Sequence, residues 1–495
     1  MMGLNLMLRD FDQMKLSMSP YQGLYDIVVT KDNLLRKIKE NIDFSFVNPM
    51  LRKQYCEDLG RPAKEPEMMF KLMFLKKVYD LSDERLIGSA QTDMAYKYFL
   101  DLDPEAPMID PSLMTKFRKI RITEDILVEM LHETIRQAIE KGLIKSSAII
   151  VDSTHTTANA RPKTVTQVMR ELSKQLRRKI YREMVELSEK FPEKPGETAE
   201  LSAEIEYTYR LLESVGTEIL QSEKNTLIEL YERIKKLLDT DQIREIRSKN
   251  DEDARFGHKT SSSTFFGCKN HIAMTEERII TGMEVSNGSA DDGKQMETLI
   301  EKSQKNGIVV KEAIGDTAYN SEDNLDVCEE KGIILFAKTN PAVAAAAAAK
   351  LDEGFCFNKD AGLLQCPAGE LAMRVEKKSA KNGNTYLTYY FSIRKCQKCP
   401  LCEQCRMGKS KTKCYSITQP SEKNRVRLEF EASDAFRERL LIRQRIEEKN
   451  GEMKVAHGLG RADSVGLGAM KLQMYFTAFV VNVKRIVKLV ESIPA

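Results

Sequence analysis

Apolar residues recur every three or four positions through most of residues 1–145. Clear examples are Ile126, Met130, Ile135 and Ile139. This spacing puts the apolar side chains on one face of an α-helix, which can then pack against a core. Ser82 precedes one such run and is a residue type that favours a helix N-cap. The pattern therefore predicts a helical domain over residues 1–145.

The pattern changes after Ser146. Residues 147–151 form a short apolar run of strand length, and Asp152 follows directly. A charged region with two apolar stripes at helical spacing then occupies residues 161–250. The stripes consist of Val168, Leu172, Leu176, Ile180, Met184 and Leu187, and of Leu227, Leu230, Ile234 and Leu237. We expect a strand that ends at Asp152 and, after it, an all-helical insertion.

Strand patterns return beyond the insertion. The expected strands cover residues 265–274, 279–285, 308–314 and 332–338. A helical pattern over residues 293–304 lies between the second and the third. Hairpin-forming strands followed by β–α–β steps are typical of a mixed sheet with helices on its faces. We therefore predict a mixed α/β fold for this part of the chain.

Length and hydropathy limit the protein to a few classes. A chain of 495 residues exceeds a single ordinary core, so about two to four domains are expected. The apolar run over residues 475–483 is too short to span a bilayer, and no targeting segment is evident. We therefore expect a cytoplasmic protein, whose ten cysteines do not form structural disulfides in a reducing compartment.

Positive charge is concentrated in one segment. The net charge of the chain is only +3, but residues 366–427 contain 14 Lys and Arg against four Asp and Glu, which gives +10. The remainder therefore carries −7, the difference between +3 and +10. A basic segment of this kind is typical of a protein that binds a polyanion such as DNA, although a solvated surface gives the same pattern.

Two aspartates stand where a metal site could form. Asp152 and Asp316 each follow a predicted strand, and ligand sites in α/β sheets gather at the carboxyl ends of strands. Carboxylate oxygens are the ligands that Mg²⁺ prefers, and a third carboxylate from a helix would complete a two-metal site for phosphodiester chemistry. An aspartate at a strand end also forms turns and caps helices, so either residue alone is ambiguous.

Three motifs together resemble those of bacterial insertion-sequence transposases of the DDE type. They are Asp152-Ser153-Thr154-His155, Gly315-Asp316-Thr317-Ala318-Tyr319, and the spaced residues Arg443, Glu447 and Lys454. The last motif of the family also has a tyrosine three residues before the arginine, where this chain has Leu440. The helical N-terminal part, with residues 60–62 and Phe117-Arg118, resembles the amino-terminal domain of such transposases. The resemblance covers nearly the whole chain.

The resemblance implies a ribonuclease-H-like core in which Asp152, Asp316 and Glu447 bind two Mg²⁺ or Mn²⁺ ions. It implies cleavage at the ends of a transposon, followed by strand transfer into target DNA. The DNA partners would be terminal inverted repeats and target DNA, and two DNA ends suggest at least a homodimer. Two alternatives stay open: an inactive transposase-derived DNA-binding regulator, and a ribonuclease-H-like nuclease without joining activity.

The spacing of the last motif has a structural consequence. Arg443, Glu447 and Lys454 are separated by four and seven residues, so on one α-helix they share a face. A carboxylate that faces metal would then lie between two cations that face DNA phosphate. An ordinary ion pair on a solvated helix is the alternative, and Glu448 and Glu452 are nearby rivals to Glu447.

Three further polar residues are candidates for the site. Lys269 and His271 alternate on the strand over residues 265–274 and so point to one face, where they would contact DNA phosphate or the metal site. A solvated sheet face is the alternative. Asp291 begins a helix and resembles an extra acidic position of the family, and a plain helix cap is the other interpretation.

Six of the ten cysteines lie in the basic segment, at positions 366, 396, 399, 402, 405 and 414. Repeated Cys-x2-Cys spacing supplies thiolates in pairs, which is the donor set of a tetrahedral Zn²⁺ site. The spacing leaves the set of four ligands open, and the set we choose is Cys366, Cys396, Cys399 and Cys405. An iron–sulfur cluster and free thiols are the alternatives. The remaining cysteines are expected to be isolated and buried, namely Cys56, Cys268, Cys328 and Cys356.

These patterns divide the chain into four parts. Residues 1–145 form a helical N-terminal domain that would bind DNA ends, and residues 146–340 form the first part of the catalytic core, interrupted by the helical insertion 161–250. Residues 341–430 form a Cys-rich basic insertion, and residues 431–495 form C-terminal helices of the core that carry Glu447. The alanine run over residues 344–349 has no assigned role.

Overall fold

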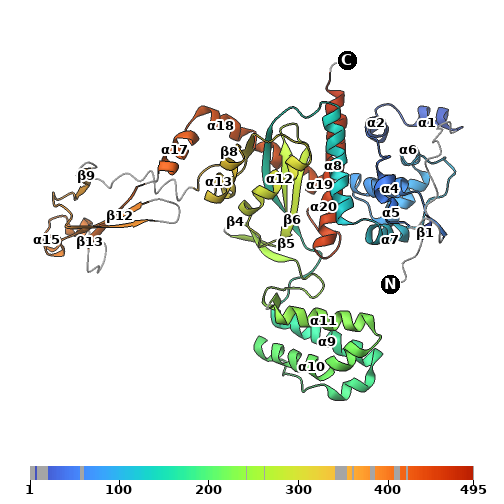
Figure 1. The fold of residues 1–495 in the computed structure, drawn as a ribbon, viewed down its shortest axis with the longest axis horizontal. Helices are drawn as coiled ribbons and strands as arrows, with labels where there is room; N and C mark the ends of the chain where they lie inside the picture. Colours follow the sequence, from blue (N-terminus) through green and yellow to red (C-terminus); the bar gives the residue numbers. More distant parts are fainter. Residues whose placement is uncertain are drawn as a thin grey trace. The chain divides into compact units, whose positions relative to one another are not determined.

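The computed structural model describes residues 6–7, 20–55, 61–240, 242–260, 262–340, 354–358, 362–379, 385–405, 413–419 and 422–493. The chain divides into two compact units: the first contains residues 1–310 and 445–495, and the second contains residues 311–444. Figure 1 shows their helices and strands. The alanine run and Cys56 lie outside the described residues. The four parts expected from the sequence, with boundaries after residues 145, 340 and 430, stay a prediction.

The N-terminal part of the first unit is helical, apart from the two-residue strands β1 and β2. Its elements are β1 (Leu6–Met7), α1 (Gln22–Val28), α2 (Leu34–Asn41), α3 (Val47–Arg52), β2 (Arg61–Pro62), α4 (Pro66–Val78), α5 (Asp83–Thr92), α6 (Met94–Phe99), α7 (Ser112–Ile120) and α8 (Glu124–Glu140). Ser82 caps α5 as predicted, because its side chain accepts a hydrogen bond from the backbone N–H of Arg85. Nearly every residue of α4 is buried, which makes this helix the centre of the helical part.

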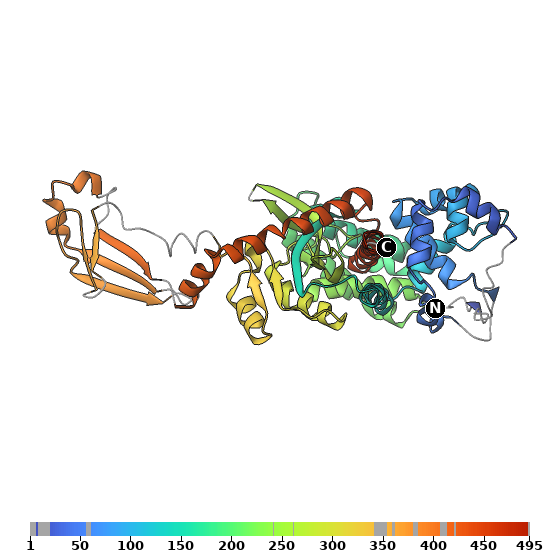
Figure 2. The ribbon, with the colours of Figure 1, turned by 90° about the horizontal axis from the view of Figure 1, so that it is seen from above.

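Helix α20 (Leu467–Glu491) is the longest helix described and packs beside α8 (Figures 1 and 2). The residues from Met474 to Val483 are all buried. The side chain of Asn482 donates to the backbone oxygen of Ile280 and accepts from its N–H, both at 2.8 Å. This two-way contact fixes α20 to the adjoining sheet. Among the described residues, no helix combines the length and hydropathy needed to cross a membrane.

Four antiparallel strands of the first unit support the candidate site. They are β3 (Ala148–Thr157), β4 (Arg255–Thr260), β5 (Ser263–Thr275) and β6 (Ile280–Asn287). Strand β5 is central, since it pairs with β3, β4 and β6. β5 and β6 form the predicted hairpin, whose turn holds Arg278 at φ +69°. The turn η3 (Gly293–Gln295) and helix α12 (Met296–Lys305) follow β6, and α12 packs on it.

Strand β3 runs further than predicted. The expected strand ended at Asp152, whereas β3 continues to Thr157 and pairs residue by residue with β5. Asp152 lies opposite Ile272, and Thr157 lies opposite Gly267. The continuation is polar, so it has no apolar pattern, and its pairing depends on a strand more than 100 residues away in the sequence. The prediction of a strand-end position for Asp152 is therefore wrong, because the aspartate lies in the middle of a strand.

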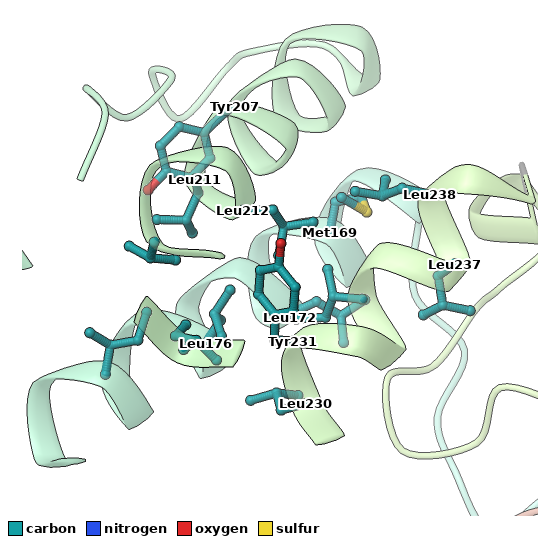
Figure 3. Packing of buried hydrophobic residues seen from close by; sticks show 14 of the residues in the cluster. Met169, Leu172, Leu176, Tyr207, Leu211, Leu212, Leu230, Tyr231, Leu237 and Leu238 are labelled. Carbon is teal, nitrogen blue, oxygen red and sulfur yellow. The ribbon is translucent and has the colours of Figure 1, made fainter. Parts of the chain in front are cut away.

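The apolar stripes of the insertion form the core of a three-helix bundle between β3 and β4 (Figure 3). Its elements are α9 (Val165–Glu183), η1 (Val185–Lys190), α10 (Leu201–Gln221), α11 (Asn225–Asp239) and η2 (Gln242–Arg244). Leu172 and Leu176 of α9 belong to the same buried cluster as Leu211 of α10 and Leu230 of α11. A side chain every three or four residues on each helix is enough to close this core.

The second unit contains a parallel pair of strands and two small antiparallel sheets. The parallel strands are β7 (Glu312–Ile314) and β8 (Ile334–Phe336), with η4 (Thr317–Tyr319) and α13 (Glu322–Glu330) between them. The other elements are β9 (Cys356–Asn358), β10 (Leu363–Gln365), β11 (Arg374–Ser379), β12 (Thr385–Phe391), α15 (Ile393–Gln397), α16 (Cys402–Cys405), β13 (Lys413–Gln419), α17 (Glu422–Glu431) and α18 (Asp434–Leu441). Parallel and antiparallel strand pairs together with helices give the predicted mixed α/β class.

Gly267 of β5 occupies a position where a side chain does not fit. A Cβ there would overlap the backbone oxygen of Thr156 and would lie 2.8 Å from the backbone nitrogen of Ala158. Because both obstacles are backbone atoms of a paired strand, we expect Gly267→Ala to lower the free energy of unfolding by about 1–3 kcal/mol, measured by chemical denaturation. Gly88→Ala is the control, since nothing lies within 4 Å of its Cβ position. Equal stability of the two variants would contradict this account.

Candidate active site

Strand β3 presents Asp152 where its side chains change from apolar to polar. The four residues before it, 148–151, are buried in the core, and Asp152 is partly exposed. The backbone at this point is held by pairing with β5 on one side. Asp152 therefore combines a fixed backbone with an accessible carboxylate.

Helix α19 (Gln444–Ala456) lies against this strand. The side-chain amide of Asn450 donates a hydrogen bond from Nδ2 to Oδ2 of Asp152 at 2.9 Å. Further along the helix, Nζ of Lys454 lies 3.5 Å from Nδ1 of His155. Glu447 is exposed and precedes Asn450 by three residues, so the two share a face of the helix. The face of α19 that carries Glu447 is therefore the face turned toward β3.

The two rivals of Glu447 are engaged in other contacts. Glu448 forms an ion pair with Arg278 at 2.6 Å. Glu452 forms ion pairs with Lys449 at 2.8 Å and with Lys484 at 3.3 Å. By its three-residue spacing, Glu447 is the glutamate of α19 that shares a face with Asn450.

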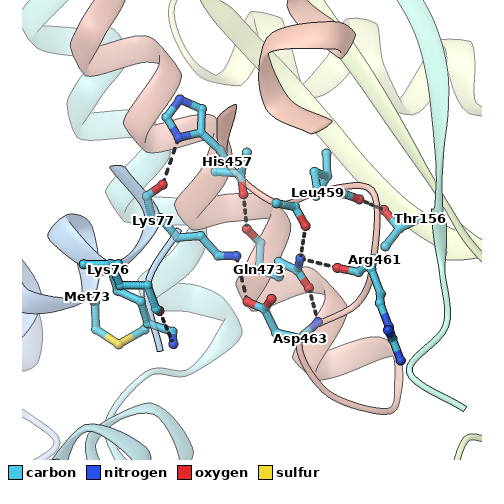
Figure 4. Close-up of polar contacts among 12 residues, drawn as sticks. Met73, Lys76, Lys77, Thr156, His457, Leu459, Arg461, Asp463 and Gln473 are labelled. Carbon is cyan, nitrogen blue, oxygen red and sulfur yellow. Dashed lines mark hydrogen bonds and ion pairs between the residues drawn. The ribbon is translucent and has the colours of Figure 1, made fainter. Parts of the chain in front are cut away.

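The loop after α19 fastens this helix to the polar end of β3 (Figure 4). The hydroxyl of Thr156 donates to the backbone oxygen of Leu459 at 2.7 Å. The backbone of Thr157 bonds the loop twice, because its N–H donates to Gly460 and its oxygen accepts from Ala462, at 3.1 and 2.8 Å. The strand thus has β5 on one side and the loop on the other over its last residues.

The same loop is bound to the N-terminal helical part through α4 (Figure 4). Nδ1 of His457 donates to the backbone oxygen of Lys77 at 2.8 Å, and Nζ of Lys77 pairs with Asp463 at 2.7 Å. Gln473 of α20 closes the loop, accepting from the N–H of Asp463 at 2.8 Å and donating to the oxygen of Arg461 at 2.9 Å. The position of α19 is therefore set by contacts with three separate elements.

The surroundings of Asp152 are cationic. Burial lowers the pKa of His155 to about 4, and the positive charges of Lys454 and Lys259 contribute to this shift. The imidazole is therefore neutral at neutral pH. Burial and Lys259 lower the pKa of Lys454, and Asp152 opposes that shift. The ring of His155 also lies against Phe265, with centroids 4.8 Å apart. A carboxylate bordered by lysines suits a polyanionic ligand that approaches together with a cation.

Two of the predicted aspartates make capping contacts. Asp316 follows β7 in the second unit, and its Oδ1 accepts from the backbone N–H of Ala318 at 2.9 Å. Asp291 likewise accepts from the N–H of Gly293 at 3.0 Å. The capping interpretation of Asp291 thus has direct support, and a role for either residue in metal binding stays a prediction.

The shared helix face expected for the last motif is correct only in part. Helix α19 begins at Gln444, so Arg443 lies before the helix, in the turn that follows α18. Because Arg443 lies outside α19, the four-residue spacing from Arg443 to Glu447 does not place the two residues on one helix. Glu447 and Lys454, seven residues apart, do lie on one face of α19.

Lys269 and His271 do not lie on a solvated sheet face. Nζ of Lys269 contacts Asp292 at 3.0 Å, and the side chain of His271 has no exposed surface. The ring of His271 bonds the hydroxyl of Ser286 through Nε2 at 2.7 Å, and burial lowers its pKa to about 4. In this structure His271 is a buried neutral ring. Phosphate binding by Lys269 and His271 stays a prediction.

The oxygen donors of Asp152 on β3 and of Glu447 and Asn450 on α19 fit a hard cation in their chemistry. Asp152 and Glu447 are carboxylates, and Oδ1 of Asn450 is a buried oxygen for which the described residues supply no hydrogen-bond partner. Oxygen donors are what Mg²⁺ takes from a protein, with water completing its shell. Among the described residues, however, no three Cys, His, Asp or Glu side chains are grouped closely enough to hold a metal. The metal sites therefore stay predictions.

Five cysteines of the second unit line one small hollow of about 30 Å³. They are Cys366, Cys396, Cys399, Cys402 and Cys405. Burial raises the pKa of the Cys396 thiol, and the four neighbouring thiols add to that rise. The hollow includes the four predicted zinc ligands and adds Cys402, whereas Cys414 is exposed on β13. Of the cysteines expected to be buried, Cys268 and Cys328 are, and Cys356 is exposed.

Sequence reasoning missed Asn450 and Lys259. Asn450 is three residues after Glu447, and this helical spacing was a signal that could have identified it. Lys259 lies on β4, a strand with no clear apolar alternation, so nothing in its local sequence indicated a position beside Lys454.

Two family models match the chain. Residues 24–120 match a transposase domain (DUF772), and residues 365–487 match a transposase DDE domain. A curated relative, the uncharacterized protein ORF8 in the nfe locus of Rhizobium meliloti, is 33% identical over 98 residues. That match covers 19% of this chain and 46% of the relative, so the chain spans about half of the relative's length.

The DDE match includes all of α19, and the N-terminal match includes α4, to which the loop after α19 is bound. Both matched regions thus take part in the arrangement around Asp152. The chain thus combines an N-terminal transposase domain with a transposase DDE domain.

Proposed function

We propose that this chain is an active DNA transposase, which cleaves DNA at the ends of a mobile element and joins those ends to target DNA. The hydrogen bond from Asn450 to Asp152 supports this most directly, because it sets the face of α19 that carries Glu447 against the strand of Asp152. We assign the catalytic core to the ribonuclease-H-like folds, with which the mixed α/β class agrees.

Asp152, Asp316 and Glu447 are the proposed ligands of two Mg²⁺ or Mn²⁺ ions. Such ions would activate a water molecule and stabilise the leaving oxygen. The water oxygen attacks the phosphorus at the element's end, the bond from phosphorus to O3′ breaks, and O3′ takes a proton. The freed 3′-hydroxyl then attacks a target phosphodiester and displaces the target's own O3′. No covalent bond between protein and DNA is needed, so no serine or tyrosine nucleophile is assigned.

Lys454 is proposed to hold a phosphate of the bound strand. It lies beside neutral His155, and among the residues described in the structure it has no ion-pair partner. Its charge is therefore available to DNA. We assign the same task to Arg443. The DNA partners are the terminal inverted repeats and the target, and the assembly on DNA is proposed to be at least a dimer.

Loss of any of the three carboxylates should abolish strand cleavage. For Asp152→Asn, Asp316→Asn and Glu447→Gln we expect a larger fall than the roughly 10- to 100-fold that follows loss of an outer-shell partner of a metal site. The assay uses DNA that carries the element's own ends with Mg²⁺, and scores cleavage and joining separately. DNA binding, measured by mobility shift without metal, should be kept.

Glu448→Gln is the matched control for this experiment. Glu448 is the neighbour of Glu447 on α19 but pairs with Arg278 at 2.6 Å, so its cleavage rate should stay within a few-fold of the wild type. Cleavage retained in all three carboxylate variants would reject the assignment. Cleavage without joining by the wild type would identify a nuclease, and intact DNA binding without cleavage would identify a regulator.

A second, structural metal is proposed for the Cys-lined hollow. Thiols are the donors that Zn²⁺ prefers, and a tetrahedral site needs four of them. We expect about one Zn²⁺ per chain by elemental analysis of protein purified without chelator. Cys396→Ser should lose the metal and lower the melting temperature, because structural zinc contributes directly to folding.

Two cysteine variants serve as controls for the zinc experiment. Cys414→Ser should keep the metal, since Cys414 is exposed and outside the hollow. Cys402→Ser should also keep it if the predicted set of Cys366, Cys396, Cys399 and Cys405 is right. Iron with visible absorbance in place of zinc would indicate a cluster, and protein without either metal would overturn the proposal.

A further inference from the structure

Helix α9 of the insertion carries two stripes of side chains on nearly opposite faces. The apolar stripe, Val168, Leu172, Leu176 and Ile180, is buried in the bundle core. The second stripe follows the same four-residue interval two positions later and consists of Arg170, Lys174, Arg178 and Arg182. Two residues correspond to a rotation of about 200° around a helix, so the cationic stripe points away from the core.

Among the three long helices of the bundle, α9 is the one with a net positive charge. α9 has six Lys and Arg against two Glu, a net of +4. α10 has one Arg against four Glu, a net of −3, and α11 has three of each sign, a net of zero. A surface that only needed to be solvated would carry mixed charges on all three helices. The concentration of positive charge on α9 therefore indicates a surface that binds an anionic partner.

Three cations of the stripe, Lys174, Arg178 and Arg182, are exposed. Within the described part of the chain, none of the three has an ion-pair partner. Arg170 differs from them, since it pairs with Glu204 of α10 at 2.6 Å. Cations that are neutralised inside the protein cannot contribute much to binding an anion, so the three exposed residues are the ones that can. We call them the α9 cationic face.

Two hollows border this face, with volumes of about 480 and 640 Å³. Lys174 and Arg178 line both, so they form the ridge between them. Lys249 adds a cation to the first hollow and Lys194 to the second. Tyr181 also lines the second and is 55% exposed, which places a hydroxyl donor beside the ridge.

We propose that the α9 cationic face binds the phosphate backbone of duplex DNA. Successive cations of the stripe are about 6 Å apart along the helix, and a duplex offers one phosphate charge per roughly 1.7 Å of its axis. A line of cations can therefore meet phosphates without reading any sequence. The inference rests on the proposed function in that DNA is the substrate, and it gives the helical insertion a role in holding that substrate.

The test compares DNA binding by the full chain and by Lys174→Glu, Arg178→Glu, Arg182→Glu combined. A labelled duplex of arbitrary sequence is titrated in EDTA from 50 to 300 mM salt, so no cleavage is involved. Each lost phosphate contact lowers the slope of log affinity against log salt by about 0.9. For the triple Glu variant we expect the magnitude of this negative slope to decrease by about 2 to 3. Its affinity for DNA at 100 mM salt should be at least tenfold lower than that of the wild type.

The matched control reverses Lys224, Lys235 and Lys236, three exposed cations of the same bundle outside α9. It changes the net charge equally and should lower the affinity less than threefold. Equal losses in both variants, or no loss in either, would overturn the proposal. A change in oligomeric mass with an unchanged salt slope would show that the face binds another copy of the chain. If the triple Glu variant misfolds, the same titration is done with Lys174→Gln, Arg178→Gln and Arg182→Gln combined. This variant should lose less DNA affinity than the Glu variant.

A different observation carries a second inference, which concerns Asn450. This residue is 9% exposed, and its Nδ2 donates to Asp152 at 2.9 Å. Its Oδ1 is buried and has no hydrogen-bond partner within the described part of the chain, an arrangement that ordinarily lowers stability. The amide nitrogen of Asn450 thus binds the carboxylate of Asp152, while the amide oxygen of the same side chain is unsatisfied.

We infer that Asn450 is a positioning residue for Asp152 and that its Oδ1 serves the cation, directly or through a bound water. The donated hydrogen bond fixes which way the carboxylate faces, and a neutral oxygen beside it adds a donor without adding charge. This inference rests on the proposed function, because it assumes that Asp152 holds a metal.

The measurement is Mn²⁺ binding to the full chain by calorimetry, without DNA. Asn450→Leu should weaken binding at least fivefold and raise the Mg²⁺ concentration needed for half-maximal cleavage by a similar factor. Asn482→Leu is the control, since Asn482 is also a buried asparagine and its side chain bonds the backbone N–H and oxygen of Ile280. It should lose stability and keep its Mn²⁺ affinity.

Equal Mn²⁺ affinity in the wild type and Asn450→Leu would overturn the role of Asn450. A wild-type chain that binds no Mn²⁺ would instead refute the metal site of the proposed function. Weakened binding in both Asn variants would indicate general damage and would also reject a specific role.

Discussion

The attachment of helix α19 to strand β3 is the constraint on which the candidate site depends. Asp152 and Asn450 are 298 positions apart in sequence, yet their side chains share a hydrogen bond. The loop after α19 makes this possible, because it bonds the backbone of Thr157 at two points and the hydroxyl of Thr156 at a third. Most of these bonds involve backbone atoms, so the position of the helix depends on the strand being extended to Thr157. The loop therefore depends on the polar residues that continue β3 beyond Asp152, because Thr156 and Thr157 supply the bonds that hold it.

The electrostatics of the site follow from the same packing. Burial keeps His155 neutral, so the charge of Lys454 beside it is not repelled by an imidazolium. Lys454 interacts electrostatically with Asp152, and Lys259 lies near Lys454. Two neutral groups, the partly exposed ring of His155 and the buried amide of Asn450, thus contact Lys454 and Asp152 respectively. In the proposed function, Asp152 binds a cation and Lys454 faces a phosphate.

The sequence could predict what depends on local pattern. The apolar stripes that include Leu172 and Leu230 predicted the insertion's helices, and the Phe265–Met274 alternation predicted the hairpin of β5 and β6. It could not predict contacts between distant segments. The end of β3 was misplaced because its pairing partner is distant, and Arg443 was put on α19 because spacing alone does not show where a helix begins. His271 was expected at a ligand-facing surface, and its burial depends on how Ser286 and Asp292 pack against β5.

The helical insertion and the candidate site share a strand. The chain enters the bundle just after Thr157 and returns at β4, and the N–H of Lys163 donates to the oxygen of Arg247 at 2.7 Å, which ties the two connections together. β3 and β4 both pair with β5, so the bundle is attached through a paired part of the sheet. The α9 cationic face and the carboxylate of Asp152 on β3 are linked by a short stretch of chain. Under the proposals above, both would contact the same DNA molecule. DNA held weakly at the α9 cationic face would have a raised effective concentration at the site of Asp152. Non-specific contacts on the insertion can therefore serve a reaction whose chemistry takes place on the strand.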